Sequence, residues 1–318
     1  MPDPARLKAF RRFGWLTLGV NVVVVLGGAM VRATGSGAGC GSHWPDCNGE
    51  VVPLAPSTET LIEFSHRATS GLALLLVLGQ LVWAYRLFPR PTFASHPVRS
   101  AAAYATGFIL VEALIGAMLV KLELVGENAS LWRALVVGLH LVNTFLLLGA
   151  LTLVPMLAGA DHDRTLGLHD QGGRAVLRLV APIALGVLLV SAAGAITALG
   201  DTLFPADSLS EGFAADTAHD AHPLVRLRVI HPLLAVLVYL AVVALGVLGP
   251  PALERARSGA AARTRSWFRA LGSLATLQIA SGTLTLVLLA PLAMQLVHLA
   301  IADAVWISLV ALLARALR

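Results

Sequence analysis

Apolar stretches of about 20 residues, nearly free of charge, recur along the whole sequence. A stretch of this length spans the hydrocarbon core of a bilayer as a helix, because a helix satisfies its own backbone hydrogen bonds in lipid. The sequence therefore predicts an all-α integral membrane protein. The eight predicted transmembrane helices cover residues 13–31, 60–86, 98–120, 131–157, 174–199, 223–248, 267–289 and 291–314.

The composition excludes two broad classes of protein. Hydrophobic residues make up 57% of the chain and charged residues 13%, against roughly 25% charged residues in an average soluble domain. The net charge of +5 would suit a nucleic-acid partner, but the basic residues lie in short loops beside apolar spans. Basic residues in such loops set membrane topology. An ordinary soluble enzyme and a nucleic-acid-binding protein are both excluded.

The distribution of Lys and Arg predicts the orientation. One set of connecting segments and ends holds 17 of the 23 basic residues: the N-terminus, 86–99, 164–178, 255–269 and 315–318. Because loops rich in Lys and Arg stay on the cytoplasmic side, we expect a multi-pass protein of the cell membrane with both termini in the cytoplasm.

The two cysteines, Cys40 and Cys47, lie in the first loop of the opposite set, GSGAGCGSHWPDCNG. The expected topology puts this loop on the oxidising side, where a disulfide is chemically permitted. A pair of structural or free thiols is the alternative. Two cysteines are too few for a disulfide scaffold or a four-thiolate metal site.

A shift of about 165 residues superimposes the two halves of the sequence. The residues that coincide are Gly28 with Gly194, His66 with His231, Glu112–Gly116 with Gln278–Gly282, and His140 with His298. Each half contains four helices, an even number, so both halves point the same way. The sequence thus predicts two tandem parallel four-helix bundles, residues 1–160 and 161–318.

Four of the ten histidines lie inside predicted helices. They are His66, His140, His231 and His298, each six to nine residues into an even-numbered helix and therefore roughly 9 to 14 Å deep. Intramembrane polar groups are costly and face the bundle interior. Four imidazoles at one depth, two per half, fit a pair that holds one haem in each four-helix bundle.

Two other interpretations of these histidines remain. A lone intramembrane histidine is often a hydrogen-bonded core residue. Zinc would need three or four ligands, and only Glu63 is placed to add one. The remaining histidines lie in loops or at interfaces, where we expect solvated or interfacial side chains: His43, His96, His162, His169, His219 and His222.

The two halves differ beside their first histidine. Glu63 precedes His66 by three residues and shares its helix face, whereas Arg228 takes that place before His231. A buried carboxylate can accept a proton or stabilise positive charge that develops during oxidation. A guanidinium suits a haem propionate. An ion pair with a nearby arginine is the structural alternative for Glu63.

Two arginines of the first half are candidate propionate partners for its haem. Arg32 ends the first helix and Arg67 follows His66, whereas their counterparts Ala198 and Pro232 are neutral. The first half is therefore predicted to do chemistry and the second to hold a fixed cofactor. Two further intramembrane acids, Glu112 and Asp303, could belong to a proton path or to a helix–helix hydrogen bond.

Several stretches together resemble haem A synthase. They are GGAMVRATGSGAGC and WPDCNG after the first helix, EFSHR at the start of the second, LIGAMLV in the third, GLHL in the fourth, and a single histidine in each of the sixth and eighth. The resemblance covers the whole chain, and the cysteine loop with EFSHR is its most specific part.

The resemblance implies a membrane oxidoreductase that converts the C8 methyl group of haem O to the formyl group of haem A, for use by terminal oxidases. It implies two successive hydroxylations with water as the oxygen source. The implied roles are haem O ligation by His66 and His140, catalysis by Glu63, an outer-loop disulfide of Cys40 with Cys47, and haem b ligation by His231 and His298. Haem O, a haem O synthase and membrane lipid are the implied partners, and a homo-oligomer is compatible with the resemblance.

The chain departs from the family pattern in three places. His43 and Asp46 flank Trp44-Pro45, Glu112 stands where a glutamine like Gln278 is more usual, and the second outer loop has no cysteine pair. These departures concern the mechanism at the level of the loops and leave the four histidine ligands unaffected. The competing functions are a non-catalytic bis-His di-haem electron-transfer protein and a haem carrier.

Overall fold

The computed structural model describes residues 3–88, 96–159, 166–168 and 170–318. Across these ranges the secondary structure is helical and no β-strand is formed. Within the described ranges, eight helices are long and apolar enough to cross a membrane. The predicted all-α class and the eight spans are therefore confirmed.

The spans are longer than their apolar stretches. The eight are α1 (Pro4–Ala33), α2 (Thr58–Leu87), α3 (Pro97–Lys121), α4 (Leu131–Leu157), α5 (Gln171–Leu203), the continuous segment of α7 (Pro223–Arg226), η2 (Leu227–Val229) and α8 (Ile230–Ala256), then α9 (Ala260–Val287) and α10 (Leu292–Ala316). Two short helices, η1 (Ser36–Ala38) and α6 (Leu209–Thr217), lie in connecting segments.

The starts of α1 and α9 differ clearly from the predicted bounds, because these helices begin well before residues 13 and 267. Both additions are basic segments that the apolar pattern does not include. At α1 the side chain of Asp3 accepts a hydrogen bond from the Ala5 amide at 3.1 Å, and Pro4 occupies the first turn. Such a cap stabilises a helix start without any apolar residue.

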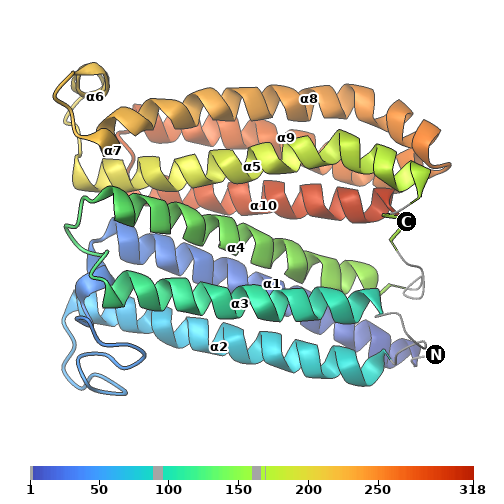
Figure 1. Cartoon of the computed structure of the whole chain (residues 1–318), viewed down its shortest axis with the longest axis horizontal. Coiled ribbons are helices and arrows are strands. Elements are labelled where there is room, and N and C mark those ends of the chain that lie inside the picture. Colours follow the sequence, from blue (N-terminus) through green and yellow to red (C-terminus); the bar gives the residue numbers. More distant parts are fainter. Residues whose placement is uncertain (1–2, 89–95, 160–165, 169) are drawn as a thin grey trace.

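Figure 1 shows α1–α4 grouped on one side of the molecule and α5, α8, α9 and α10 on the other. Within the first group α1 and α3 each pack against both α2 and α4, and within the second α5 and α9 each pack against both α8 and α10. The groups meet where α4 contacts α5 and α10. The predicted domain boundary at 160/161 lies outside the described residues, so the division into two domains stays a prediction.

The centre of the molecule lies between the two groups. α4 is the most enclosed of the eight spans and α10 the next. The indole nitrogen of Trp306 on α10 donates a 2.5 Å hydrogen bond to the carbonyl of Phe145 on α4, and their rings are 5.8 Å apart between centroids. The main apolar cluster includes both side chains.

Both termini lie at one end of the helices, and the Cys40–Cys47 loop and α6 lie at the other (Figure 1). We call the second end the disulfide-loop end. Each of the four intramembrane histidines lies six to nine residues from the start of a span that begins at this end. The four are therefore at similar depth, as predicted. The orientation of the ends in a membrane stays a prediction.

Two of the loop histidines cap helices. Nδ1 of His96 accepts a hydrogen bond from the amide of Val98 at 3.3 Å, and Nδ1 of His222 accepts one from the amide of Leu224 at 3.2 Å. His43 instead pairs with Asp46 at 3.4 Å. The predictions for His162 and His169 concern positions outside the described residues.

Candidate functional site

Cys40 and Cys47 form the predicted disulfide, with their Cα atoms 4.4 Å apart. They lie in residues 34–57, which we call the disulfide loop. The loop backbone rests on the first turn of α2, where the Thr60 hydroxyl donates to the Gly39 carbonyl at 2.7 Å. A methyl group added at Gly39 would lie 2.6 Å from the Thr60 amide nitrogen. Only glycine allows so close a backbone approach.

Glu63 is buried beneath this loop and joins it to α2. Its Oε2 accepts a hydrogen bond from the backbone amide of Cys40 at 2.8 Å. Its Oε1 accepts from Nη2 and Nε of Arg67, at 2.5 and 3.2 Å. The ion pair considered as the structural alternative is therefore present. A carboxylate has about four acceptor positions, so three hydrogen bonds leave one of them open.

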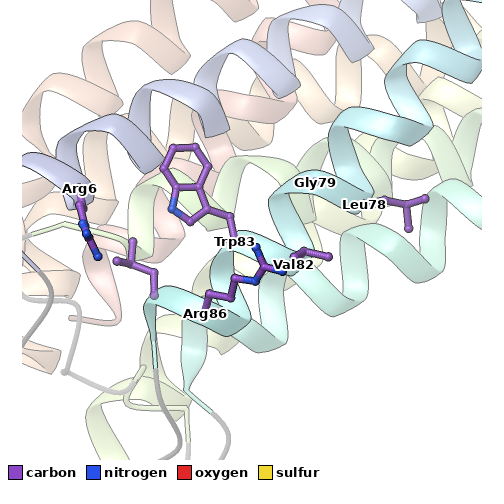
Figure 2. Close-up of a pocket in the computed structure, with 7 residues that line it drawn as sticks. Arg6, Leu78, Gly79, Val82, Trp83 and Arg86 are labelled. Atoms are coloured by element: carbon purple, nitrogen blue, oxygen red, sulfur yellow. The ribbon is translucent and has the colours of Figure 1, made fainter.

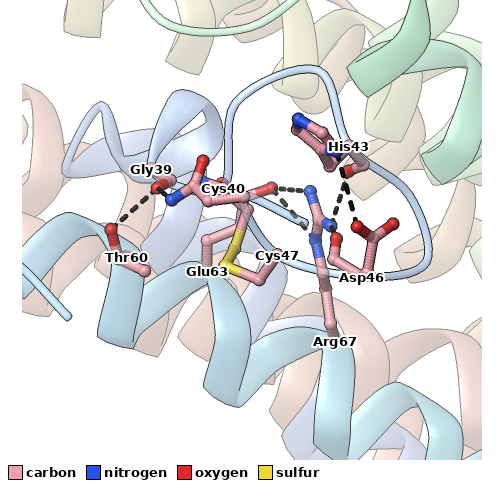
Figure 3. A network of polar contacts seen from close by, with 9 residues as sticks. Gly39, Cys40, His43, Asp46, Cys47, Thr60, Glu63 and Arg67 are labelled. Atoms are coloured by element: carbon pink, nitrogen blue, oxygen red, sulfur yellow. Dashed lines mark hydrogen bonds and ion pairs between the residues drawn. A yellow bond between two sulfur atoms is a disulfide. The ribbon is translucent and has the colours of Figure 1, made fainter. Parts of the chain in front are cut away.

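Arg67 holds the other side of the disulfide loop. Its Nη1 donates to the carbonyls of His43 at 2.8 Å and Asp46 at 2.5 Å, in addition to the contacts with Glu63 (Figure 3). These contacts use four of the five N–H groups of the guanidinium. The side chain therefore fixes the loop above His66 and retains one donor for another group.

His66 lies against α1. A methyl group added at Gly28 would lie 3.1 Å from Cε1 of His66. Nδ1 of His66 is buried and has no hydrogen-bond partner among the described residues. His140 lies at a similar depth on α4, which also packs against α1. The first predicted pair thus lies at one depth on two helices that share the neighbour α1, and one of its buried nitrogens has no partner among the described residues.

The two histidines of the second pair lie close together. The ring centroids of His231 and His298 are 6.2 Å apart and the ring planes are perpendicular, at 89°. Nδ1 of His231 lies 3.0 Å from the carbonyl of Val190. Because a carbonyl can only accept, Nδ1 carries the proton and Nε2 keeps a free lone pair. Methyl groups added at Gly194 and Gly282 would lie 2.9 Å from the rings of His231 and His298 respectively.

The second histidine of each pair has different neighbours in the two halves. Oε1 of Glu112 lies 3.4 Å from Nδ1 of His140. The corresponding histidine, His298, lies 3.1 Å from the amide nitrogen of Gln278 and 2.9 Å from the hydroxyl of Ser281. Sequence reasoning noted Glu112 and Gln278 as equivalent positions but did not identify either as a neighbour of a histidine.

Arg32 reaches from α1 to the other half of the molecule. Its Nη1 donates to the Ala198 carbonyl at 2.6 Å and the Thr202 hydroxyl at 2.7 Å, and its Nη2 donates to Oε1 of Gln295 at 2.7 Å. All three acceptors belong to α5 or α10. The structure thus directs this predicted partner of the first haem toward the second half.

Arg228 anchors the end of α5 beside His231. Its Nη2 donates to the carbonyls of Gly200 at 2.8 Å and Phe204 at 2.5 Å, and its Nε lies 3.2 Å from Asp201. It therefore resembles Arg67 in holding the connecting segment next to a histidine. The two arginines differ in the position of the acid that they contact. Asp201, the partner of Arg228, lies on α5, whereas Glu63, the partner of Arg67, lies on α2 together with Arg67.

The spacing of the second histidine pair is compatible with two ligands of one iron porphyrin, and no cluster typical of zinc accompanies it among the described residues. Among the described residues, no three His, Cys, Asp or Glu side chains gather to hold a metal ion. Two imidazoles on opposite sides of one ion, at about 2 Å per metal–nitrogen bond, have ring centroids roughly 6 Å apart. The spacing of His231 and His298 matches this value. The unpartnered nitrogen of His66 is a second feature that a metal would satisfy.

Two further features are an open groove and a buried acid. An open groove of about 750 Å³ runs between α1 and α2 near the terminal end, with Arg6 and Arg86 beside Trp83 (Figure 2). Its nearest lining residue on α2, Leu78, lies about 18 Å along the helix from His66. Asp303 is buried in α10, and neither of its carboxyl oxygens has a hydrogen-bond partner among the described residues.

Comparison with known proteins places this architecture in a family. Residues 11–310 match the family model described as cytochrome oxidase assembly protein, COX15-CtaA. A Thermus thermophilus protein named Protoheme IX farnesyltransferase is 45% identical over 305 residues, which is 96% of this chain and 48% of that protein. The chain thus spans about half the length of this relative.

Shorter matches join the chain to proteins named Heme A synthase. The one from an Exiguobacterium species is 35% identical over 130 residues, 41% of this chain and 40% of the relative. The one from Bacillus mycoides is 49% identical over 98 residues, 30% of each chain. Because the family model covers nearly the whole sequence, the chain belongs to the cytochrome oxidase assembly protein family.

Proposed function

We propose that this chain oxidises the C8 methyl group of haem O to a formyl group, which yields haem A for terminal oxidases. Family membership and the relatives named Heme A synthase support this reaction. The observation that carries it is an asymmetry: a buried carboxylate, Glu63, lies one turn from the first histidine of one pair, and a guanidinium, Arg228, takes that place at the other.

The proposed reaction is two successive hydroxylations with water as the oxygen source. Each hydroxylation adds the oxygen of one water molecule, breaks one methyl C–H bond and passes two electrons to an oxidant of the quinone class, with release of two protons. The geminal diol then loses water to give the aldehyde. The protein must therefore hold the methyl group near a group that accepts protons.

In this proposal His66 and His140 bind haem O and Glu63 accepts protons released at the methyl group. Glu63 suits that role because its three hydrogen bonds leave one acceptor position open. Arg67 fixes the orientation of that carboxylate and keeps one N–H for a propionate. The disulfide loop covers Glu63 and so excludes bulk water from it.

His231 and His298 bind haem b in this proposal, and when bound that haem supplies one-electron transfer. The Val190 carbonyl sets the tautomer of His231. Arg228 and Arg32 lie beside this half and provide positive charge for propionates. A non-catalytic electron carrier would explain both histidine pairs but not the carboxylate at one of them alone.

A haem O synthase is the proposed partner, because haem O must be supplied by transfer of a farnesyl group to protohaem IX. The Thermus relative, whose name describes that transfer, matches this chain over only 48% of its own length. This supports a close association of the two activities. We also propose a cell-membrane location with both termini cytoplasmic, from the distribution of Lys and Arg.

The decisive experiment is haem extraction and mass analysis from cells that express the protein together with a haem O source. Wild type should yield formyl haem, and Glu63→Gln should retain haem O or a hydroxylated intermediate. Glu50→Gln, an exposed acid in the same loop, is the matched control and should behave like wild type. Unchanged haem A in Glu63→Gln removes the catalytic role of Glu63, and bound haem without haem A in wild type indicates an electron carrier or haem carrier.

A further inference from the structure

The repeat places an acid beside one histidine and an amide beside its counterpart. Glu112 of α3 and Gln278 of α9 occupy equivalent positions, and each lies next to the second histidine of its half. The two residues have nearly the same shape and differ mainly in charge. Their contacts differ as well, since Glu112 approaches Nδ1 of His140 whereas Gln278 approaches Nε2 of His298.

Glu112 is held in place by a network on α4. Its Oε2 accepts a hydrogen bond from the side-chain amide of Asn143 at 2.5 Å, and its Oε1 accepts one from the hydroxyl of Thr144. Asn143 is itself oriented by the Phe108 carbonyl, at 2.9 Å. Of the two possibilities raised for Glu112, the helix–helix hydrogen bond is thus present. The same network aims the carboxylate at His140.

Nδ1 of His140 is buried and makes no hydrogen bond among the described residues, yet Oε1 of Glu112 lies 3.4 Å from it. A small movement of the ring would convert this contact into a hydrogen bond. In the second half both ring nitrogens of His298 already face neutral groups, the amide of Gln278 and the hydroxyl of Ser281. The carboxylate contact belongs to the first half.

A histidine ligand whose second nitrogen faces a carboxylate becomes more basic and binds the metal more strongly. A more basic ligand stabilises ferric over ferrous iron. We propose that Glu112 is a positioning residue that, through His140, lowers the reduction potential of the iron bound in the first half, and that Gln278 leaves the second iron without this shift. The inference rests on the ligand assignments of the proposed function.

The test is a redox titration of the purified, haem-loaded protein, followed by its visible absorption bands. Glu112→Gln should lower the ferric-to-ferrous ratio of one haem at a given potential about tenfold. For a one-electron couple this corresponds to a midpoint potential about 59 mV higher. Glu123→Gln, which removes an exposed acid just after α3, controls for net charge and should move neither midpoint.

The outcomes separate this inference from the proposed function. If two haems are bound and Glu112→Gln moves neither couple, the role of Glu112 is overturned while the proposed function stands. If Glu123→Gln moves a couple as far as Glu112→Gln does, the shift comes from net charge and the inference is overturned. A wild-type protein that binds no haem overturns both.

Discussion

The backbone amide of Cys40 donates a 2.8 Å hydrogen bond to the carboxylate of Glu63. This contact joins the disulfide loop to the helix face that also carries His66. The acid proposed to accept protons is therefore also the attachment point of the loop that covers it. A substitution of Glu63 must then be analysed for stability as well as for chemistry.

Glu63→Leu should destabilise the protein by about 3 kcal/mol, because it leaves the largely buried Arg67 without its ion-pair partner and the Cys40 amide without an acceptor. Denaturant unfolding in detergent measures this change. The double variant Glu63→Leu with Arg67→Met should recover part of the loss, since both charges are then absent. Equal loss in the single and double variants would contradict the coupling.

Replacement of both cysteines by serine should lower the free energy of unfolding by about 2.5 kcal/mol, the chain-entropy value for so short a closed loop. Thermal unfolding with and without a reductant measures the effect. Reductant should destabilise wild type and leave the double-serine variant unchanged. A reductant effect of similar size on the variant would show that the disulfide is not its target.

Arg32→Met should weaken the contact between the two halves by about 3 kcal/mol, because hydrogen bonds from a charged group to three acceptors of α5 and α10 are lost together. Thr202→Val removes one acceptor and should cost about 1 kcal/mol. Unfolding of the two variants under the same conditions compares them. Equal losses would mean that the Thr202 contact alone carries the effect of Arg32.

The start of α5 should be sensitive to acid. The backbone amide of Gly173 and then the Arg257 side chain hold the pKa of Asp170 below its ordinary value of 3.8. A depressed folded pKa means that the cap contributes above pH 3.8 and is lost as pH falls through the lower folded value. Hydrogen exchange at Gly173, corrected for the intrinsic pH effect, should rise in this window.

Asp170→Asn should remove this pH dependence, because asparagine caps a helix without titrating. The amide of Gly173 would then exchange at similar corrected rates on both sides of the window. Persistence of the acid effect in Asp170→Asn would assign it to another group.

The spans, the repeat and the depth of the histidines could be predicted from the sequence because they depend on patterns within single helices. Apolar length identifies each span, and the equivalence of Gly28 and Gly194 has a direct structural basis, since each contacts the first histidine of its half. The basic starts of α1 and α9 were missed because helix formation there depends on local hydrogen bonds rather than on lipid. Asp3 caps α1, and Glu254 accepts hydrogen bonds from the amides of Gly259 and Ala261 at the start of α9.

Contacts between helices were harder to predict. The sequence shows that Arg32 ends a helix, but not that its side chain reaches Ala198 on α5. The Val190 carbonyl beside His231 belongs to the backbone and leaves no signal in residue type. The capping role of His96 depends on the turn before Pro97, whereas its residue type suggested only an interfacial side chain.

At three glycines the helix backbone packs directly against a histidine ring, because no side chain stands between them. At Gly28, Gly194 and Gly282 even the smallest side chain would push an imidazole aside, although none of the three glycines carries a charge or a polar side chain. A deep mutational scan should therefore find these three positions as intolerant as the histidines themselves. Lipid-facing neighbours on the same helices should accept most apolar exchanges.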